Sequence, residues 1–336
     1  MSDEIRFKGV VTVPAAGSIP ARAGAVNAGP PPYLRTRARH AMYGAMESLD
    51  PQTAQSRAAT FIVLDTREPE AFARGHLAGS GHIPHAELPA RRSELPPRDA
   101  AVLVVAEDAS AAAMAAAALE SLGYSAVSWL GAPLAALPGG LADRAPATRL
   151  WRPAPFLEEV LPLISRPRGI AQDSSALTGN PPLALDLACG AGRDAVFLAQ
   201  HGFEVEGWDH APEAIERTHE LARRHGVTVR TEIRDLERPD LPPPARPFDL
   251  IVCFRFLHRP LFPWMERALA PGGWLVYETY RTGQERFGRP IRAHFLLARD
   301  ELARAFPTLE TIRYEERDPE AGPVSARLLA RKSNRT

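Results

Sequence analysis

The sequence predicts an α/β protein of two folded domains, the second built on a doubly wound, mostly parallel sheet with an antiparallel edge hairpin. Three observations favour this fold class. The chain has 336 residues, more than one typical domain needs. From residue 181 onward, short apolar runs alternate with segments of helical periodicity, as they do in βαβ units. Two late runs, Leu309–Glu315 and Val324–Lys332, are suited to antiparallel strands at the edge of that sheet.

The composition is that of an ordinary globular protein. Forty basic residues balance forty acidic ones, and 45% of the residues are hydrophobic. This balance argues against a broad nucleic-acid or membrane contact, although it allows a local basic pocket. No apolar stretch approaches the length of a membrane span, and the N-terminus lacks the pattern of a secretory signal. We therefore expect a cytoplasmic protein with no nucleic-acid or membrane partner.

The two cysteines, Cys189 and Cys253, are too few for a disulfide framework or a structural zinc site. Both are expected to be small packing residues rather than nucleophiles. We expect no metal site.

Residues 1–55 carry little periodic pattern and are expected to form a flexible N-terminal arm. The stretch 15–32 is rich in alanine, glycine and proline, which favours an extended, unpacked chain. A basic run follows, which is interpreted as the solvated face of a short helix: Arg35, Arg37, Arg39 and His40.

Residues 56–142 are expected to form the first domain. Apolar runs predict strands at 61–65, 101–105 and 126–130. The second and third are separated by a predicted helix, Ser110–Leu122, with Ser110 as its N-cap and Gly123 as its stop.

The first of these strands ends in the series Asp-x-Arg-x-x-x-x-Phe-x-x-Gly-His, which runs from Asp65 to His76. With the strand–loop–helix that follows, this series resembles a rhodanese domain over residues 58–141. In that family the catalytic cysteine lies directly after the second strand, where this chain has Ala106. Alanine supplies no thiolate, and the neighbouring Glu107 and Asp108 would raise the pKa of any thiol placed there. We expect a domain without sulfurtransferase activity that serves as a scaffold or contacts a protein partner.

Residues 143–182 are expected to form a linker and a helix that leads into the second domain. Prolines 153 and 155 favour the start of that helix, and Phe156, Val160 and Leu163 are predicted to share its buried face.

The domain at residues 183–336 begins with the predicted buried strand Leu183–Leu187, a turn containing Gly190 and Gly192, and the predicted helix Arg193–Gln200. The next predicted strand ends in Asp209, which is placed to accept hydrogen bonds from ribose hydroxyls. These residues indicate a nucleotide-binding unit. A dinucleotide remains an alternative, because the turn also fits the loose dinucleotide pattern.

The segment Asp186-Leu187-Ala188-Cys189-Gly190-Ala191-Gly192 resembles the acid-x-Gly-x-Gly-x-Gly motif of class I S-adenosylmethionine (SAM)-dependent methyltransferases, with Ala188 in place of the first glycine. The turn Leu-x-Pro-Gly-Gly-x-Leu at residues 269–275 is a frequent companion of that motif. The resemblance implies a Rossmann-like sheet and SAM as the cofactor. It assigns the cofactor contacts to Asp186, Ala188, Gly190, Gly192, Asp209, His210, Asp235 and Leu236.

The segment after the fourth predicted strand, Phe248–Cys253, should face the transferred methyl group. Its basic residues Arg255, His258 and Arg259 are candidates to hold an anionic acceptor by charge-assisted hydrogen bonds. Arg292 and His294, which follow the fifth predicted strand, Trp274–Glu278, are further cationic candidates.

The series Gly207-Trp208-Asp209-His210 and the ending Leu328–Lys332 are similar to the tellurite-resistance methyltransferases. That resemblance implies a small-molecule acceptor such as tellurite or selenite. Methylation of a thiol or another small metabolite remains an alternative. So does a sensor or adaptor that binds SAM without turnover.

Overall fold

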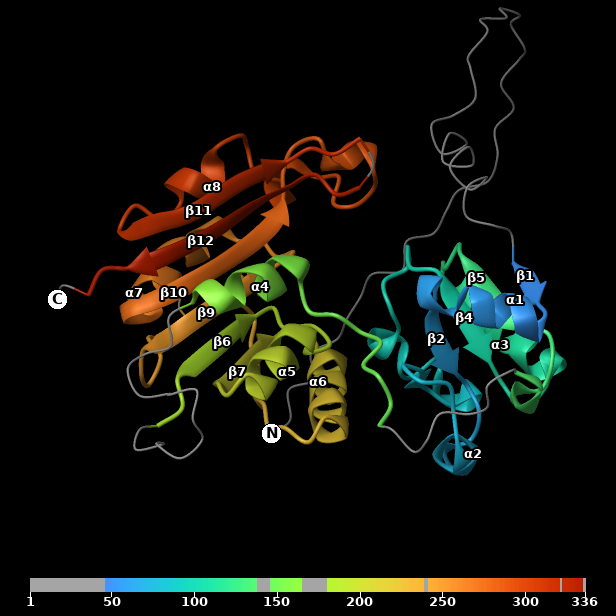
Figure 1. Ribbon diagram of the computed structural model, residues 1–336. Coiled ribbons are helices and arrows are strands. Elements are labelled where there is room, and N and C mark those ends of the chain that lie inside the picture. The colour runs from blue at the N-terminus through green and yellow to red at the C-terminus, as the bar shows by residue number, and fades with distance from the viewer. Residues whose placement is uncertain (1–45, 138–145, 165–179, 239–240, 321, 335–336) are drawn as a thin grey trace, which may run out of the picture. The chain divides into compact units, whose positions relative to one another are not determined.

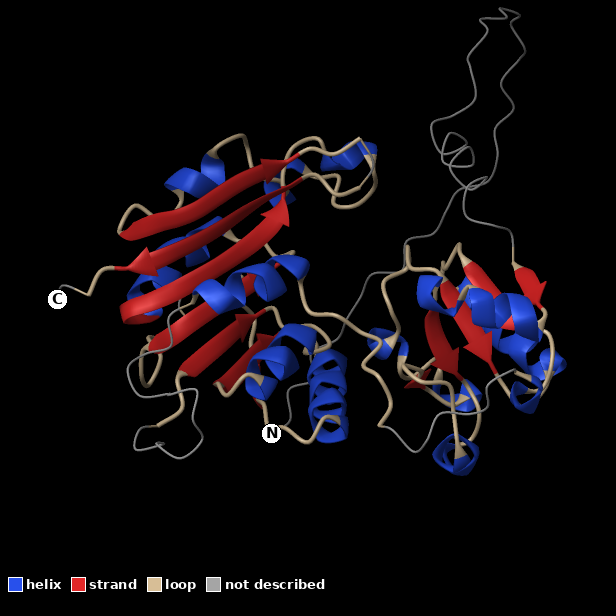
Figure 2. Cartoon of the chain, viewed as in Figure 1, coloured by secondary structure: helices blue, strands red, loops and turns tan. Residues whose placement is uncertain are grey.

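The computed structural model describes residues 46–137, 146–164, 180–238, 241–320 and 322–334 (Figure 1). The expected arm up to residue 45, with its basic run, lies outside the described residues, as do residues 138–145 and 165–179 of the expected linker. The described residues form two sheets, each flanked by helices (Figure 2).

The N-terminal sheet is five-stranded and parallel, in the order β1-β5-β4-β2-β3. Its strands are β1 (Glu47–Leu49), β2 (Ile62–Asp65), β3 (Gly81–His82), β4 (Val102–Val105) and β5 (Val127–Leu130). Its helices are α1 (Pro51–Ser56), α2 (Pro69–Arg74) and α3 (Ala109–Ser121). Every residue of β4 is buried, as expected for the centre of a parallel sheet covered on both faces.

The expected arm ends earlier than residue 55. Glu47–Leu49 pairs in parallel with Ser128–Leu130, and α1 follows directly, with the Asp50 side chain accepting a hydrogen bond from Thr53 N at 3.0 Å. The expectation for residues 46–55 was therefore wrong. The stretch is ordered by a partner strand about eighty residues away, which no local pattern indicates.

The N-cap of α3 also differs from the prediction. Asp108, not Ser110, accepts a hydrogen bond from Ala111 N at 2.9 Å. The helix begins at Ala109, so the carboxylate of the preceding residue reaches the free N–H groups of the first turn.

The motif residues at the end of β2 form a buried structural cluster. The Arg67 guanidinium contacts Asp65 Oδ2 at 2.6 Å and donates to Gly75 O at 2.8 Å. The Phe72 ring stacks on His76 and on His82, with centroid distances of 3.8 and 4.3 Å. These side chains therefore hold the loop from β2 to β3, and the motif has a structural explanation within the fold.

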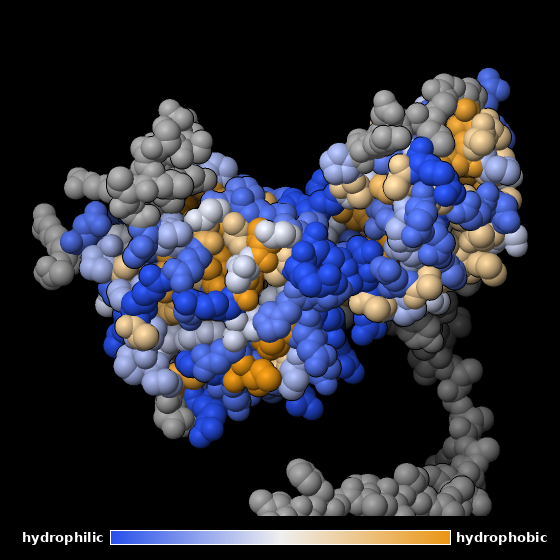
Figure 3. Space-filling view, turned by 90° about the horizontal axis from the view of Figure 1, so that it is seen from below, coloured by the Kyte–Doolittle hydropathy of each residue, from blue (hydrophilic) through white to orange (hydrophobic). Residues whose placement is uncertain are grey.

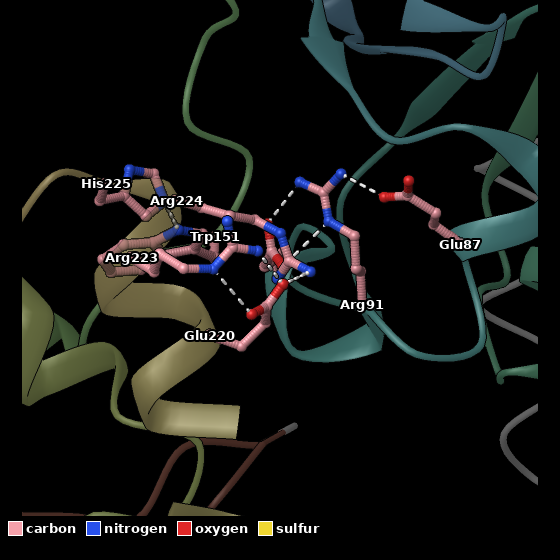
Figure 4. Close-up of polar contacts among 8 residues, drawn as sticks. Glu87, Arg91, Trp151, Glu220, Arg223, Arg224 and His225 are labelled. Atoms are coloured by element: carbon pink, nitrogen blue, oxygen red, sulfur yellow. Dashed lines mark hydrogen bonds and ion pairs between the residues drawn. The ribbon is translucent and has the colours of Figure 1, made fainter. Parts of the chain in front are cut away.

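The segment around residue 150 passes directly from one core to the next. Leu150 packs in the N-terminal core, and a Cβ on Gly81 would lie only 2.1 Å from its Cγ. Trp151 is buried in the C-terminal core, where its Nε1 donates to His225 Nε2 at 2.8 Å (Figure 4). Figure 4 also shows the ion pairs Arg91–Glu87 and Arg223–Glu220.

The leading helix is α4 (Pro155–Val160), which buries Phe156 and Val160 in the C-terminal core. Leu163 was expected on the same face, but its side chain is 55% exposed. The α-helix ends at Val160 and continues as a tighter 3-10 turn through Leu163, so the helical spacing no longer applies there.

The C-terminal sheet is seven-stranded, in the order β11-β12-β10-β9-β6-β7-β8. Its strands are β6 (Leu183–Leu187), β7 (Glu204–Asp209), β8 (Arg230–Ile233), β9 (Phe248–Phe254), β10 (Leu269–Tyr280), β11 (Leu309–Arg317) and β12 (Ser325–Lys332). Its remaining helices are α5 (Arg193–Gln200), α6 (Pro212–Arg224), α7 (Phe262–Ala268) and α8 (Glu301–Arg304). β12 runs antiparallel to β10 and β11, and the other pairs are parallel. The predicted doubly wound, Rossmann-like sheet with an antiparallel edge hairpin is confirmed.

β6 separates two apolar layers. Leu183, Leu185 and Leu187 pack into one core layer, and Ala184 packs into the layer on the opposite face. Both faces of the strand are therefore buried, which explains why every residue of β6 except Asp186 is apolar.

The chain order across this sheet defines its ligand edge. From β6 the chain moves outward through β7 to β8, and then returns to β9 on the other side of β6. In such sheets ligands bind beyond the carboxyl ends of the strands at this reversal. The turn after β6 and the segment after β9 therefore lie at the edge where a ligand is expected.

No helix among the described residues is long and apolar enough to cross a membrane. On the face drawn in Figure 3, apolar residues reach the surface in separate patches among hydrophilic ones.

Candidate functional site

The turn between β6 and α5 has a repeated left-handed backbone. Ala188, Gly190 and Gly192 have φ values of 58°, 57° and 74°. The conformation costs an L-residue roughly 1–2 kcal/mol, so Ala188 occupies a position that suits glycine better. This explains why the motif it resembles has glycine there.

The two glycines of the turn meet different surroundings. A Cβ on Gly190 would find nothing within 4 Å, so the turn faces open space at this point. A Cβ on Gly192 would lie 2.5 Å from Thr218 Cγ2, so this glycine lets the turn pack closely on α6. The turn is thus anchored on one side and accessible on the other.

Asp209 is hydrogen-bonded to the backbone of this turn. Its Oδ2 accepts a hydrogen bond from Gly190 N at 2.9 Å, and its Oδ1 accepts one from Ala211 N at 3.0 Å. His210 Nδ1 lies 3.5 Å from Asp209 Oδ1, while its side chain is 81% exposed. The carboxylate predicted to bind ribose is therefore held beside the glycine turn.

Asp186 is a buried carboxyl group with an unsatisfied oxygen. The residue is 2% exposed, and its Oδ2 has no hydrogen-bond partner. Burial, and then the nearby Asp194 carboxyl group, raise the pKa of Asp186 well above its usual range. Buried polar atoms are nearly always paired in folded proteins, so a lone acceptor beside the turn suits a ligand that brings a donor.

The remaining predicted cofactor residues follow β8. Leu236 is buried in the same core layer as Leu187. Asp235 is exposed and accepts a hydrogen bond from Glu237 N at 3.0 Å. The Arg234 guanidinium lies over the Trp208 ring, 3.9 Å from its centroid. These side chains border the ligand edge next to β7.

Both cysteines are buried, and burial raises the pKa of each thiol. Neither is therefore a thiolate near neutral pH, in agreement with the expected packing role.

A cavity of about 570 Å³ lies beyond the carboxyl ends of β9 and β10. Arg255 lines it from the segment after β9, and Arg289 and Arg292 line it from the loop after β10. Arg255 and Arg292 were predicted candidates. Arg289 was missed, although it lies in the same loop as Arg292 and has the same charge.

Arg255 has an unusual backbone. Its φ is 59°, and its N–H donates to Glu278 O at 2.9 Å, which extends the pairing of β9 with β10 by one residue. Such a conformation costs on the order of 1–3 kcal/mol and is concentrated at functional sites. The strain therefore marks Arg255 as a residue whose position matters.

Three other predicted acceptor residues, His258, Arg259 and His294, do not line this cavity. Arg259 donates to the carbonyl oxygens of His294 and Leu296, both at 2.9 Å, and pairs with Glu301. His258 borders a separate hollow of about 60 Å³. His294 packs on Phe295, with ring centroids 3.9 Å apart. The geometry of Arg259 is that of a residue fastening the 294–301 segment.

Comparison with known proteins identifies the class of each domain. A methyltransferase domain family matches residues 184–273, and a rhodanese-like domain family matches residues 48–132. The chain contains a rhodanese-like domain followed by a methyltransferase domain, and the predicted pairing of these two domain classes is confirmed.

Individual relatives cover part of the chain. It is 27% identical over 145 residues to the probable S-adenosyl-L-methionine-dependent methyltransferase TehB of Haemophilus influenzae, covering 41% of this chain and 49% of that protein. It is 30% identical over 144 residues to hemagglutinin 1 of Eikenella corrodens, covering 40% of this chain and 46% of that protein. This chain thus spans about half the length of these curated relatives. The crystal structure of H. influenzae TehB is similar to 46% of this chain and 58% of its own, with 22% identity and a TM-score of 0.40.

Proposed function

We propose that this protein transfers a methyl group from SAM to a small, anionic acceptor. The observation that carries the proposal is the left-handed turn after β6, with the Asp209 carboxylate fixed against it by the Gly190 N–H. The arginine-lined cavity beyond β9 and β10 supports an anionic acceptor.

The described residues fit SAM by their chemistry. Each Asp209 oxygen accepts one backbone N–H and has lone pairs left for ribose hydroxyls. The unpaired Asp186 Oδ2 is complementary to the cationic amine of the methionine part. Asp235 and Leu236 would border the adenine, with His210 at the rim. When bound, SAM supplies a methyl group on a positively charged sulfur, which makes that methyl electrophilic.

The protein's own task is to align the acceptor and exclude water. Arg255, Arg289 and Arg292 would hold the acceptor's negative charge. A base is needed only if the acceptor atom carries a proton. Glu237 and Tyr280 line the same cavity and are the candidates for that role.

The similarity to TehB favours an acceptor of the tellurite or selenite type, and the arginines of the cavity suit a small anion of any kind. A thiol or another small metabolite is the alternative substrate, and a SAM sensor without turnover is the alternative function. His258 and Arg259 are proposed to act on the acceptor indirectly, through the segments that they contact.

For the rhodanese-like domain, we propose a non-catalytic role as a contact site for a protein partner. Ala106 occupies the position after β4, and the carboxylate of Asp108 caps α3. The proposed setting is the cytoplasm.

Calorimetry with SAM, followed by detection of S-adenosylhomocysteine with tellurite, selenite, thiols and carboxylates, tests the proposal. We expect SAM to bind and at least one acceptor to release S-adenosylhomocysteine. If SAM does not bind, the proposed methyltransferase activity is wrong. Binding without release for every acceptor class favours the sensor.

A further inference from the structure

The cavity beyond β9 and β10 is larger than a bare oxyanion needs. A three-oxygen anion fills a space on the order of 100 Å³, a few times the roughly 30 Å³ that one water occupies in the liquid. The cavity holds about 570 Å³, within the range of about 300–1,000 Å³ typical of sites for organic ligands. Its size therefore favours an acceptor with a carbon skeleton.

Much of the cavity wall is apolar. Phe256 and Leu257 line it from the segment after β9, and Ile291 and Phe295 from the loop after β10. Ile291 is 65% exposed and Phe295 is 37% exposed. Apolar side chains gathered at a cavity and left in water indicate a ligand that covers them. A fully hydrated oxyanion gains nothing from such a wall.

The three arginines that line the cavity could bind one negatively charged group of a ligand. Within the described residues, no carboxylate lies within ion-pair distance of Arg255, Arg289 or Arg292, although Arg255 interacts with the Asp194 carboxyl group at longer range. In contrast, Arg281 and Arg286, which belong to the same loop, both contact Asp318. Glu237 is the acidic residue among the lining side chains, so positive charge is in excess.

We propose that the acceptor is an organic acid with an aliphatic or aromatic body. Its carboxylate is held by the three arginines, and its body covers Ile291, Phe295 and Phe256. This inference rests on the proposed methyl transfer and narrows its substrate class.

The test measures binding of matched probes to the full chain loaded with S-adenosylhomocysteine, by calorimetry. The probes are 3-phenylpropionate, 3-phenylpropanol without the charge, acetate without the body, and selenite and tellurite as bare oxyanions. We expect 3-phenylpropionate to bind at least tenfold more tightly than each of the others. Equal or tighter binding of either oxyanion, or no binding of 3-phenylpropionate, overturns the inference.

Two variants separate the parts of the site. Arg292→Ala should weaken 3-phenylpropionate at least tenfold and leave 3-phenylpropanol unchanged, whereas Ile291→Ser should weaken both. Arg299→Ala is the matched control, because its side chain is 86% exposed and does not line the cavity. If Arg292→Ala and Ile291→Ser both bind 3-phenylpropionate as tightly as the parent, the proposed acceptor site is wrong. Affinity for S-adenosylhomocysteine is measured first, so that loss of the cofactor site is distinguished from failure of the acceptor assignment.

Discussion

Asp209 Oδ2 accepts a hydrogen bond from the backbone N–H of Gly190 at 2.9 Å, across nineteen positions of sequence. The bond joins the end of β7 to the turn after β6, the two features from which nucleotide binding was predicted. One carboxylate thus fixes the shape of the turn and remains beside the space that the turn leaves open. Its position depends on the parallel pairing of β6 with β7.

Replacing Asp209 with asparagine should weaken SAM binding about 10- to 100-fold. The amide has the same shape but loses the charge, and hydrogen bonds to charged groups contribute roughly 1.5–3 kcal/mol. Calorimetry with SAM measures the change, with Glu216→Gln on the exposed side of α6 as the control. If Asp209→Asn binds SAM with unchanged affinity, Asp209 does not bind the ribose.

The left-handed turn predicts that substitutions at two of its positions change the free energy of unfolding in opposite directions. Ala188→Gly should raise the free energy of unfolding by about 0.5–1 kcal/mol, because glycine adopts a φ of 58° without steric cost. Gly192→Ala should lower it by roughly 2 kcal/mol or more, since the new Cβ would add strain and a 2.5 Å contact with Thr218. Urea unfolding followed by tryptophan fluorescence checks both. Equal midpoints for the two variants would contradict the turn geometry.

Asp186 predicts a proton linkage. Burial raises the pKa of Asp186 in the folded state, so the unfolded chain releases this proton first as pH rises. The contribution of Asp186 to the free energy of unfolding should therefore fall between its usual pKa and the raised folded value. Asp186→Asn should be more stable than the parent above that window, and it should not show this pH dependence.

The same group should couple SAM binding to pH. If the cationic amine of SAM pairs with the Asp186 carboxylate, binding favours the charged form and releases a proton when the group starts protonated. Calorimetry in two buffers with different ionisation enthalpies counts that proton. Asp186→Asn should show a smaller count, and an identical count in parent and variant would exclude Asp186 as the source.

Arg259 is predicted to act by positioning the 294–301 segment. Arg259→Ala removes bonds to two backbone carbonyls and to Glu301, so the loop that carries Arg292 and Phe295 loses its attachment. We expect KM for the acceptor to rise several-fold more than kcat falls, with SAM affinity nearly intact. Arg259→Lys should partly restore KM. A loss confined to kcat would instead place Arg259 at the reacting atoms.

The rhodanese-like domain should form no thiocyanate from thiosulfate and cyanide, because Ala106 provides no sulfur nucleophile. Ala106→Cys should stay far below an active rhodanese, since the adjacent Glu107 and Asp108 disfavour a thiolate. Thiocyanate formation by the parent chain would contradict the proposed non-catalytic role.

Local patterns were sufficient where a segment's structure depends on its own residues. The strand Leu183–Leu187 and the helix Arg193–Gln200 have the predicted bounds, because a mostly apolar run and the glycine turn that follows it can both be recognised in the sequence. The edge hairpin was likewise predicted from two β-rich runs near the C-terminus. The structure of residues 46–55 was not predicted, because β1 is ordered by its pairing with β5, which is distant in the sequence.

The proposed acceptor site was also predicted only in part from the sequence. Basic residues after β9 and β10 were visible in the sequence, but their partners were not. Only the folded chain separates Arg259, which pairs with Glu301, from Arg255 and Arg292, which line the cavity.

By itself the sequence determined the two domain classes, the glycine turn with its acid, and the missing cysteine at Ala106, because each depends on the residue types present and their spacing. The tertiary structure decided which arginines face the cavity, how large that cavity is, and which carboxyl group lies buried without a partner. Those properties arise from segments far apart in the chain that the sheet brings to one edge, and residue spacing alone does not encode them.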